Sequence, residues 1–153
     1  MMRAFGCVVV ATLSLTGCMA GAAPRDTAGQ VTASASVDAF QVKVGDCTGS
    51  LKEGDVSDLQ VIPCADPHFY EAYANTQLTD SAYPGESAVI KQASKFCTAE
   101  FKSFIGLATK DSGYDMFYMY PVEQSWATGD REVLCLAGSD KGKLAGSLKG
   151  SEK

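Results

Sequence analysis

Residues 87–105 form the stretch that decides the fold, SAVIKQASKFCTAEFKSFI. Apolar side chains recur in it every three or four residues, which is the spacing of an amphipathic helix with one buried face. They are Val89, Ala93, Phe96, Cys97, Phe101, Phe104 and Ile105. Pro84-Gly85-Glu86 precedes the stretch and Gly106 follows it, as is typical at the start and end of a helix. The sequence therefore predicts one principal helix, with Cys97 facing the core.

Five shorter segments around this helix have strand patterns. They are residues 40–44, 59–62, 69–78, 116–120 and 131–137. The first alternates apolar and polar residues and ends at the turn pair Gly45-Asp46, and the second stops at Pro63. The last is expected to be a central strand. We therefore expect an α+β fold, a small antiparallel or mixed sheet with the principal helix packed on one face.

The composition limits the possible functions. The 153 residues include 13 Lys and Arg against 18 Asp and Glu, a formal net charge of −5. Proteins that bind nucleic acid use Lys and Arg to neutralise phosphates, so this acidic chain is not expected to bind DNA or RNA. An apolar content of 46% is enough for a packed core, which excludes a wholly disordered chain.

The N-terminus has the pattern of a lipoprotein signal peptide at residues 1–17. One positive charge, at Arg3, leads into an apolar stretch that is too short to span a membrane. Leu15-Thr16-Gly17-Cys18 then resembles a bacterial lipobox, in which the Cys thiol is acylated and the Cys becomes the new N-terminus. The alternative is an ordinary signal peptide with a chance Cys. We expect Cys18 to anchor the mature protein on the outer face of the cytoplasmic membrane.

Three segments make up the rest of the chain. Residues 18–39, after lipidation at Cys18, are mostly small and polar and are predicted to be a flexible tether. Residues 40–138 are predicted to form the folded domain. Residues 139–153 hold four Lys, two acids and several Gly and Ser, and are predicted to be a disordered, mildly basic tail.

Four Cys remain after signal-peptide removal and lipidation: Cys47, Cys64, Cys97 and Cys135. An even number in an exported domain indicates two disulfides, which have three possible connectivities. A zinc site is the alternative, but the sequence has no Cys-x2-Cys pair among them. Cys47 and Cys64 lie at adjacent ends of two predicted strands, a natural geometry for a local bridge, and a Cys97–Cys135 bridge would join the helix to the last strand. No metal or cofactor is expected.

Candidate catalytic residues are few. His68 is the only His, and with Asp66 and Glu71 it could form a metal site or an acid–base pair. A zinc site usually needs three or four N or S ligands, so we favour a structural His that is hydrogen-bonded across its Pro-containing turn. No nucleophile elbow or phosphate-binding Gly-rich loop occurs. Two carboxylates could serve glycoside hydrolysis, but nothing in the sequence marks a pair. We therefore predict no catalytic residue.

An aromatic group is the better candidate for binding. Tyr118, Tyr120 and Trp126 combine a flat apolar face with a polar tip, which suits sugar rings or a peptide. The alternative is that these side chains belong to the core, and Trp126 could equally plug the end of the sheet. Together with His68, these three residues are the candidate binding residues.

Four motifs, taken in order, resemble those of the septum-formation domain family of actinobacterial envelope proteins. They are Val44-Gly45-Asp46-Cys47; Val61-Ile62-Pro63-Cys64-Ala65-Asp66-Pro67-His68 with Glu71; Tyr83-Pro84-Gly85-Glu86 ahead of Cys97; and Tyr120-Pro121-Val122-Glu123-Gln124-Ser125-Trp126-Ala127-Thr128-Gly129-Asp130-Arg131, leading to Cys135. The resemblance covers almost the whole of residues 42–137. It implies an exported, tethered domain with two structural disulfides and a link to septation or cell division. It carries over no activity and no catalytic residue.

These features together predict a non-enzymatic binding or scaffolding module that is held at the membrane through Cys18 and associated with septum formation. Its partner is expected to be an envelope or division protein or a wall polymer. The alternatives are a wall-polymer hydrolase that uses acidic-loop carboxylates and a metal-responsive sensor built on His68, Asp66 and Glu71.

Overall fold

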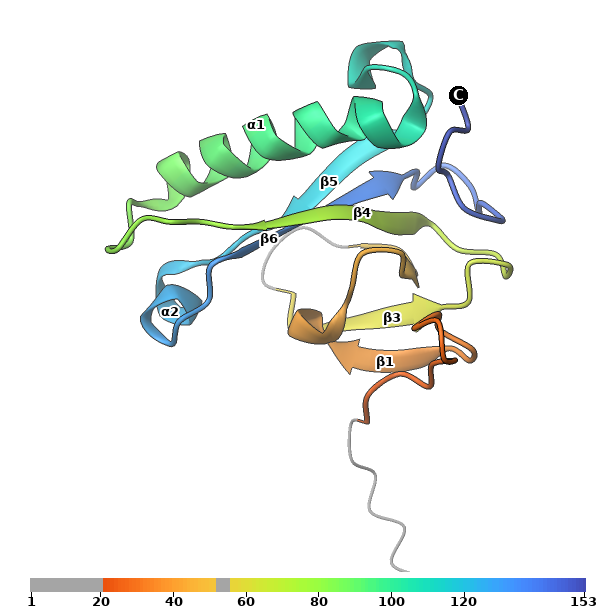
Figure 1. Ribbon diagram of the computed structural model, residues 1–153, viewed down its shortest axis with the longest axis horizontal. Coiled ribbons are helices and arrows are strands. Elements are labelled where there is room, and N and C mark those ends of the chain that lie inside the picture. The colour runs from red at the N-terminus through yellow and green to blue at the C-terminus, as the bar shows by residue number, and fades with distance from the viewer. Residues whose placement is uncertain (1–20, 52–55) are drawn as a thin grey trace, which may run out of the picture.

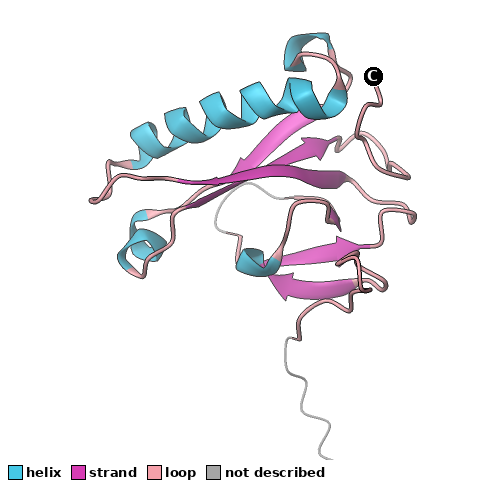
Figure 2. Cartoon of the chain, in the orientation of Figure 1, coloured by secondary structure: helices cyan, strands magenta, loops and turns pink. Residues whose placement is uncertain are grey.

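The computed structural model describes residues 21–51 and 56–153. In chain order its elements are β1 (Ala35–Asp38), η1 (Ala39–Gln41), β2 (Cys47–Thr48), β3 (Asp58–Ile62), β4 (Tyr70–Gln77), α1 (Glu86–Ile105), η2 (Thr109–Asp111), β5 (Asp115–Met119), α2 (Glu123–Ala127) and β6 (Glu132–Gly138). Figure 2 distinguishes the helices from the strands. The predicted α+β fold with one principal helix is confirmed.

The six strands form one antiparallel sheet in the order β1-β3-β2-β4-β6-β5. β4 and β6 make its longest ladder. β2 is only two residues long and joins β3 to β4, so that Cys47 lies opposite both Ile62 and Glu71. β6 lies between β4 and β5, which confirms the prediction that the last strand is an interior one.

α1 covers one face of the sheet and contacts β4, β5 and β6 (Figure 1). Its buried residues are spaced four apart, which keeps them on one side of the helix. They are Val89, Ala93, Cys97, Phe101 and Ile105. Gly106 ends the helix with φ at 96°, a conformation that suits Gly, and its N–H donates to the Lys102 carbonyl. The predicted helix is therefore present, and it begins one residue earlier than expected.

The other face of the sheet is covered by the curled end of the same sheet. β1 and β3 lie beneath β4 and β6, on the side away from α1 (Figure 1). Successive side chains of a strand point to opposite faces, so β6 contributes to two cores. Val133, Cys135 and Ala137 pack with α1, and Leu134 and Leu136 pack with residues of β1 and β3. We call these two clusters the helix-side core and the strand-side core.

The prediction of a strand at residues 40–44 is wrong. The strand is β1, which ends just before, and η1 follows it. The Asp38 carboxylate accepts the Phe40 N–H at 2.9 Å, and this bond favours a tight turn over a continued strand. Phe40 and Val44 are therefore exposed, at 64% and 47%, while Val42 is buried. The alternation of this segment reflects a loop with one buried side chain.

The flexible tether predicted at residues 18–39 is wrong for its described part, residues 21–39. Val37 of β1 is buried in the strand-side core, together with Ala23 and Val31 from the segment before β1. Ala and Val fill these positions without producing a periodic pattern, so no strand is predicted there from the sequence. The folded domain therefore begins well before residue 40.

A partly buried ion pair fixes this N-terminal segment. The guanidinium of Arg25 donates to both carboxylate oxygens of Asp46, at 2.6 and 2.7 Å, and the Lys43 N–H donates to the same carboxylate at 2.8 Å. Asp46 is only 2% exposed. The hydrogen bond to Asp46 raises the pKa of Arg25, so the guanidinium stays charged. The segment is thus attached to the domain by charge as well as by apolar packing.

The disordered tail predicted at residues 139–153 is also wrong, because its residues pack against the domain. Leu148 is buried in the helix-side core, and Leu144 packs against the same core. Leu144 also exchanges two backbone hydrogen bonds with His68. The Glu71 carboxylate accepts the Leu148 N–H at 2.6 Å. The C-terminal residues are therefore part of the folded domain.

The predicted signal peptide, residues 1–17, and the lipidation site Cys18 lie outside the described residues. None of the helices in the described part of the chain is both long enough and apolar enough to cross a membrane. α1 has 20 residues, but Lys91, Lys95 and Lys102 occupy exposed positions along it.

Candidate functional site

A groove of about 810 Å³ lies along β5, at one edge of the sheet. Part of its lining comes from β5 and the turn after it, including Phe117, Met119 and Tyr120. Another part comes from Phe40 of η1 and from Val56, just before β3. The groove therefore joins two parts of the chain that are far apart in sequence.

The groove exists because the curled sheet does not close into a barrel. β1 and β5 are its two edge strands, and among the described strands β5 pairs only with β6. Among residues 21–51 and 56–153, no further backbone hydrogen bond involves β5. The curl places η1, which directly follows β1, in the same groove as β5. An unpaired strand edge therefore borders an open groove that is lined by aromatic and aliphatic side chains.

The structure places two of the three candidate aromatic residues in this groove. Tyr118 and Tyr120 both line it, and their ring centroids are 6.0 Å apart. Trp126 is only 5% exposed and lies in the helix-side core. Its ring packs against Tyr83, and the guanidinium of Arg131 lies 3.7 Å from the ring centroid. Trp126 is therefore a core residue, which is the alternative that the sequence left open for it.

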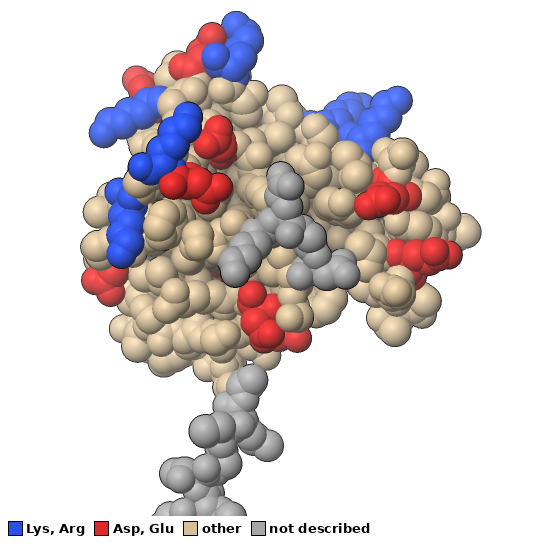
Figure 3. Space-filling view, turned by 180° about the vertical axis from the view of Figure 1, so that it is seen from behind, with Lys and Arg blue, Asp and Glu red and all other residues tan. Residues whose placement is uncertain are grey.

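Three carboxylates line the groove, from Glu86, Asp130 and Glu132. The Glu132 N–H donates to Asp130 at 3.0 Å, and the Asn75 side-chain amide donates to Glu132 at 2.7 Å. No ion pair found among the described residues includes any of the three acids. Figure 3 shows acidic residues on the side of the molecule where α2 and the start of α1 lie. The groove therefore carries negative charge without a paired cation from the described chain.

Burial and this negative charge raise the pKa values of two neighbouring tyrosines, Tyr120 and Tyr83. Burial raises the pKa of Tyr120, and the nearby charge of Glu86 raises it further. Burial also raises the pKa of Tyr83, with additional contributions from Glu86 and Glu123. Both phenol groups are therefore neutral at physiological pH. In that state Tyr120 can donate a hydrogen bond, and its hydroxyl lies 3.5 Å from Glu86 Oε1.

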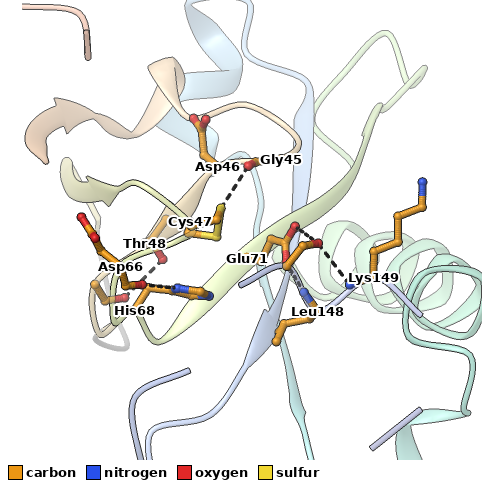
Figure 4. The surroundings of a disulfide bond; sticks show 12 residues. Gly45, Asp46, Cys47, Thr48, Asp66, His68, Glu71, Leu148 and Lys149 are labelled. Carbon is orange, nitrogen blue, oxygen red and sulfur yellow. Dashed lines mark hydrogen bonds between the residues drawn. A yellow bond between two sulfur atoms is a disulfide. The ribbon is translucent and has the colours of Figure 1, made fainter. Parts of the chain in front are cut away.

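His68 is a buried structural residue. Its side chain is fully buried, and Nδ1 lies 2.9 Å from the Asp66 carbonyl oxygen, across the turn that contains Pro67 (Figure 4). Its Nε2 has no hydrogen-bond partner among the described residues. His68 therefore has the structural role that the sequence analysis favoured. Its ring is buried and is not accessible to a ligand from solvent.

Asp66 and Glu71 do not join His68 in one site. Glu71 is 4% exposed, and its two carboxylate oxygens accept hydrogen bonds from Ser147 Oγ at 2.8 Å and from the Leu148 N–H at 2.6 Å. The side chain of Asp66 is exposed. Figure 4 shows Glu71 directed toward the C-terminal residues. The three residues of the sensor hypothesis therefore have separate structural roles.

Both disulfides have the expected pairing, Cys47–Cys64 and Cys97–Cys135. The first joins β2 to the turn after β3, and the second joins α1 to β6. The two sulfurs of the first lie within 4.8 Å of a Glu71 oxygen, so these three residues are close enough to hold a metal ion. Zinc binds the thiolate form of Cys, however, and sulfurs joined in a disulfide are not thiolates. We therefore regard both pairs as structural cross-links.

The sequence missed the residues that shape the groove. The alternating pattern predicts a strand at Phe40, whereas Asp38, two residues earlier, favours a turn and forms one. No sequence pattern marks Glu86 and Glu132 as neighbours, because only the packing of α1 beside β6 brings them to one groove. The sequence indicates the two tyrosines because its predicted strand at residues 116–120 has aromatic residues on both faces.

Comparison with known proteins identifies the family. Residues 2–140 match a family model described as Septum formation. No curated protein and no solved structure was found to match the chain. The matched range includes both disulfides, the groove and the N-terminal segment that packs against the strand-side core. Since the match covers most of the sequence, the chain belongs to the septum-formation family.

Proposed function

We propose that this chain is a lipoprotein of the outer face of the cytoplasmic membrane, and that its domain is a non-enzymatic binding module in septum formation. Membership of the septum-formation family supports the link to septation. The observation that carries the binding role is the groove along β5, where apolar and aromatic side chains border an unpaired strand edge. Exposed surfaces of this kind mark sites of interaction in soluble domains.

Anchoring through Cys18 is supported by the lipobox pattern Leu15-Thr16-Gly17-Cys18. The test is membrane fractionation of cells that produce the tagged full chain, its Cys18→Ala variant or its Cys7→Ala variant. Cys7 lies in the same predicted signal peptide and is the matched control. We expect Cys18→Ala to lose the membrane association and Cys7→Ala to keep it. Membrane retention of Cys18→Ala would contradict the anchoring.

The binding role is tested by photo-crosslinking in dividing cells. A benzoylphenylalanine in place of Phe40 puts the crosslinker on an exposed groove residue, and the same residue in place of Val44 is the control. Both positions are exposed and apolar, but Val44 does not line the groove. We expect an adduct with an envelope or division protein from position 40 and not from position 44. Equal adducts from both positions, or none from either, would contradict a role for the groove.

A wall-polymer hydrolase is the second candidate, because three carboxylates line the same groove. Glycosidases use two such groups, one as acid and the other as base or nucleophile. Incubation of the purified full chain with wall glycan, followed by measurement of new reducing ends, separates the two functions. The binding module is expected to release none. Release that is lost in Glu132→Gln would replace the binding proposal by the hydrolase.

A further inference from the structure

We propose that the groove accepts an extended peptide segment of a partner protein, which pairs with β5 as an additional strand and carries a Lys or Arg toward the groove carboxylates. The proposal rests on the binding role proposed above and specifies its partner. A single segment of about five residues would cover the length of β5, roughly 17 Å.

The first argument is the state of the β5 edge. An edge strand presents unpaired N–H and C=O groups, which proteins usually cover with a charged residue, a proline, a bulge or a neighbouring element. β5 has one acidic residue, Asp115, at its start, and the residues from Met116 to Met119 carry no charge and no proline. No other described strand pairs with this edge. The edge is therefore suited to main-chain pairing with another chain.

The second argument is the arrangement of side chains around that edge. Phe117 and Met119 pack against the strand-side core, whereas Met116 and Tyr118 pack against the helix-side core. All four are only partly buried and all four line the groove. An added strand would therefore find apolar surface on both of its faces. Phe40, at 64% exposure, offers a further apolar contact.

The third argument is charge, which decides between classes of partner. Glu86, Asp130 and Glu132 line the groove, and no ion pair with a described Lys or Arg neutralises them. They attract a cationic side chain and repel the phosphates of an anionic wall polymer. Main-chain pairing with an unpaired edge also requires a polypeptide. The observations therefore favour a basic peptide over a polysaccharide.

The test starts from a random dodecapeptide phage library that is selected on the full chain in detergent solution. We expect enriched sequences with Lys or Arg and alternating apolar residues. The best peptide is then synthesised in two N-methylated forms, with alternate backbone amides blocked in one register or in the other. Because a paired strand directs alternate amides toward its neighbour, only one register should weaken binding, by about tenfold or more per two lost hydrogen bonds.

Protein variants test the charge requirement without disturbing the fold. The double variant Glu86→Gln, Glu132→Gln is expected to weaken the peptide several-fold, and the effect should vanish for a peptide whose Lys or Arg is replaced by Gln. Asp66→Asn removes an exposed charge elsewhere and should leave affinity unchanged. Equal effects of the two N-methylation registers would overturn strand pairing. Enrichment of acidic peptides, or binding of a wall glycan but of no peptide, would overturn the partner class.

The outcomes separate this inference from the proposed function. A septal adduct from position 40, with no dependence on the N-methylation register, would retain the binding role and reject strand addition. Register-dependent peptide binding without any envelope adduct in cells would retain strand addition and reject the septal role.

Discussion

The two faces of the sheet are covered in different ways. The helix-side core is closed by one continuous helix whose buried residues recur every four positions. The strand-side core is closed by the curled edge of the sheet, with short strands, η1 and the segment before β1. β6 supplies apolar residues to both cores, so the difference lies in the covering elements. The curled edge leaves an opening along β5, and that opening is the groove, to which α1 contributes Glu86 at its start.

The largest expected effect comes from the helix side. Phe101 is fully buried, with its ring edge-on to Tyr73 at a centroid distance of 5.9 Å. We expect Phe101→Ala to lower the free energy of unfolding by about 3–5 kcal/mol, because it removes a large buried ring and leaves a cavity. Phe40→Ala, at the exposed groove, is the control and should change it by less than about 0.5 kcal/mol. Urea unfolding of both variants measures the difference, and similar losses would contradict the assignment of Phe40 to an open surface.

The two disulfides should differ in how much they stabilise the domain. Cys97–Cys135 closes a separation of 38 residues and Cys47–Cys64 one of 17. In the chain-entropy model, whose mechanism is disputed, these closures stabilise by about 4 and about 3 kcal/mol respectively. Replacement of each pair by Ala, followed by urea unfolding, should therefore cost more stability for Cys97–Cys135 than for Cys47–Cys64. A larger loss of stability from removal of Cys47–Cys64 would show that this disulfide also stabilises the folded state directly, in addition to restricting the unfolded chain.

Two buried carboxylates hold the two ends of the described chain. Asp46 binds Arg25 in the N-terminal segment, and Glu71 binds Ser147 and the Leu148 N–H in the C-terminal segment. We expect Asp46→Ala and Glu71→Ala each to cost about 1–3 kcal/mol, because buried donors lose their partner. Hydrogen exchange should locate the loosening near residue 25 in the first variant and near residue 148 in the second. Loosening at the same place in both variants would contradict separate attachment of the two ends.

The smallest effect is a pH dependence on the strand side. Burial, with the nearby charge of Asp140, raises the pKa of Tyr70 to about 12, above the value of about 10 in an unfolded chain. The native state then holds a proton that the unfolded state has lost, so the contribution of Tyr70 is complete below pH 10 and is lost as the pH rises toward 12. Tyr70→Phe should therefore show a smaller decline of stability across this range than the unmodified chain. Parallel declines in urea unfolding at pH 9 and 11 would contradict the raised pKa.

The sequence was most informative where a single element carries its own pattern. α1 and β3 have a regular pattern of burial, while β4, β5 and β6 contain runs of apolar or aromatic residues. The structure has all five close to the predicted residues. β1 is hard to predict because Val37 is the one bulky apolar residue among its four, ASVD, and the strand gains its burial from pairing with β3. The attachment of Leu148 depends on Glu71, whose partner lies far along the chain. The groove depends both on the local pattern of β5 and on contacts between distant parts of the chain. Only its tyrosines, which belong to the local pattern, could be predicted.

The ordered N-terminal segment limits how far the domain can lie from the membrane. A free segment up to residue 39 would allow the groove to range over about 70 Å from the lipid. Ala23, however, is buried in the strand-side core, and only five positions separate it from Cys18. A chain of that length spans at most about 18 Å even when fully extended. With the proposed anchor in place, the domain would lie close to the membrane surface, and the groove would meet its partner in the zone next to the lipid.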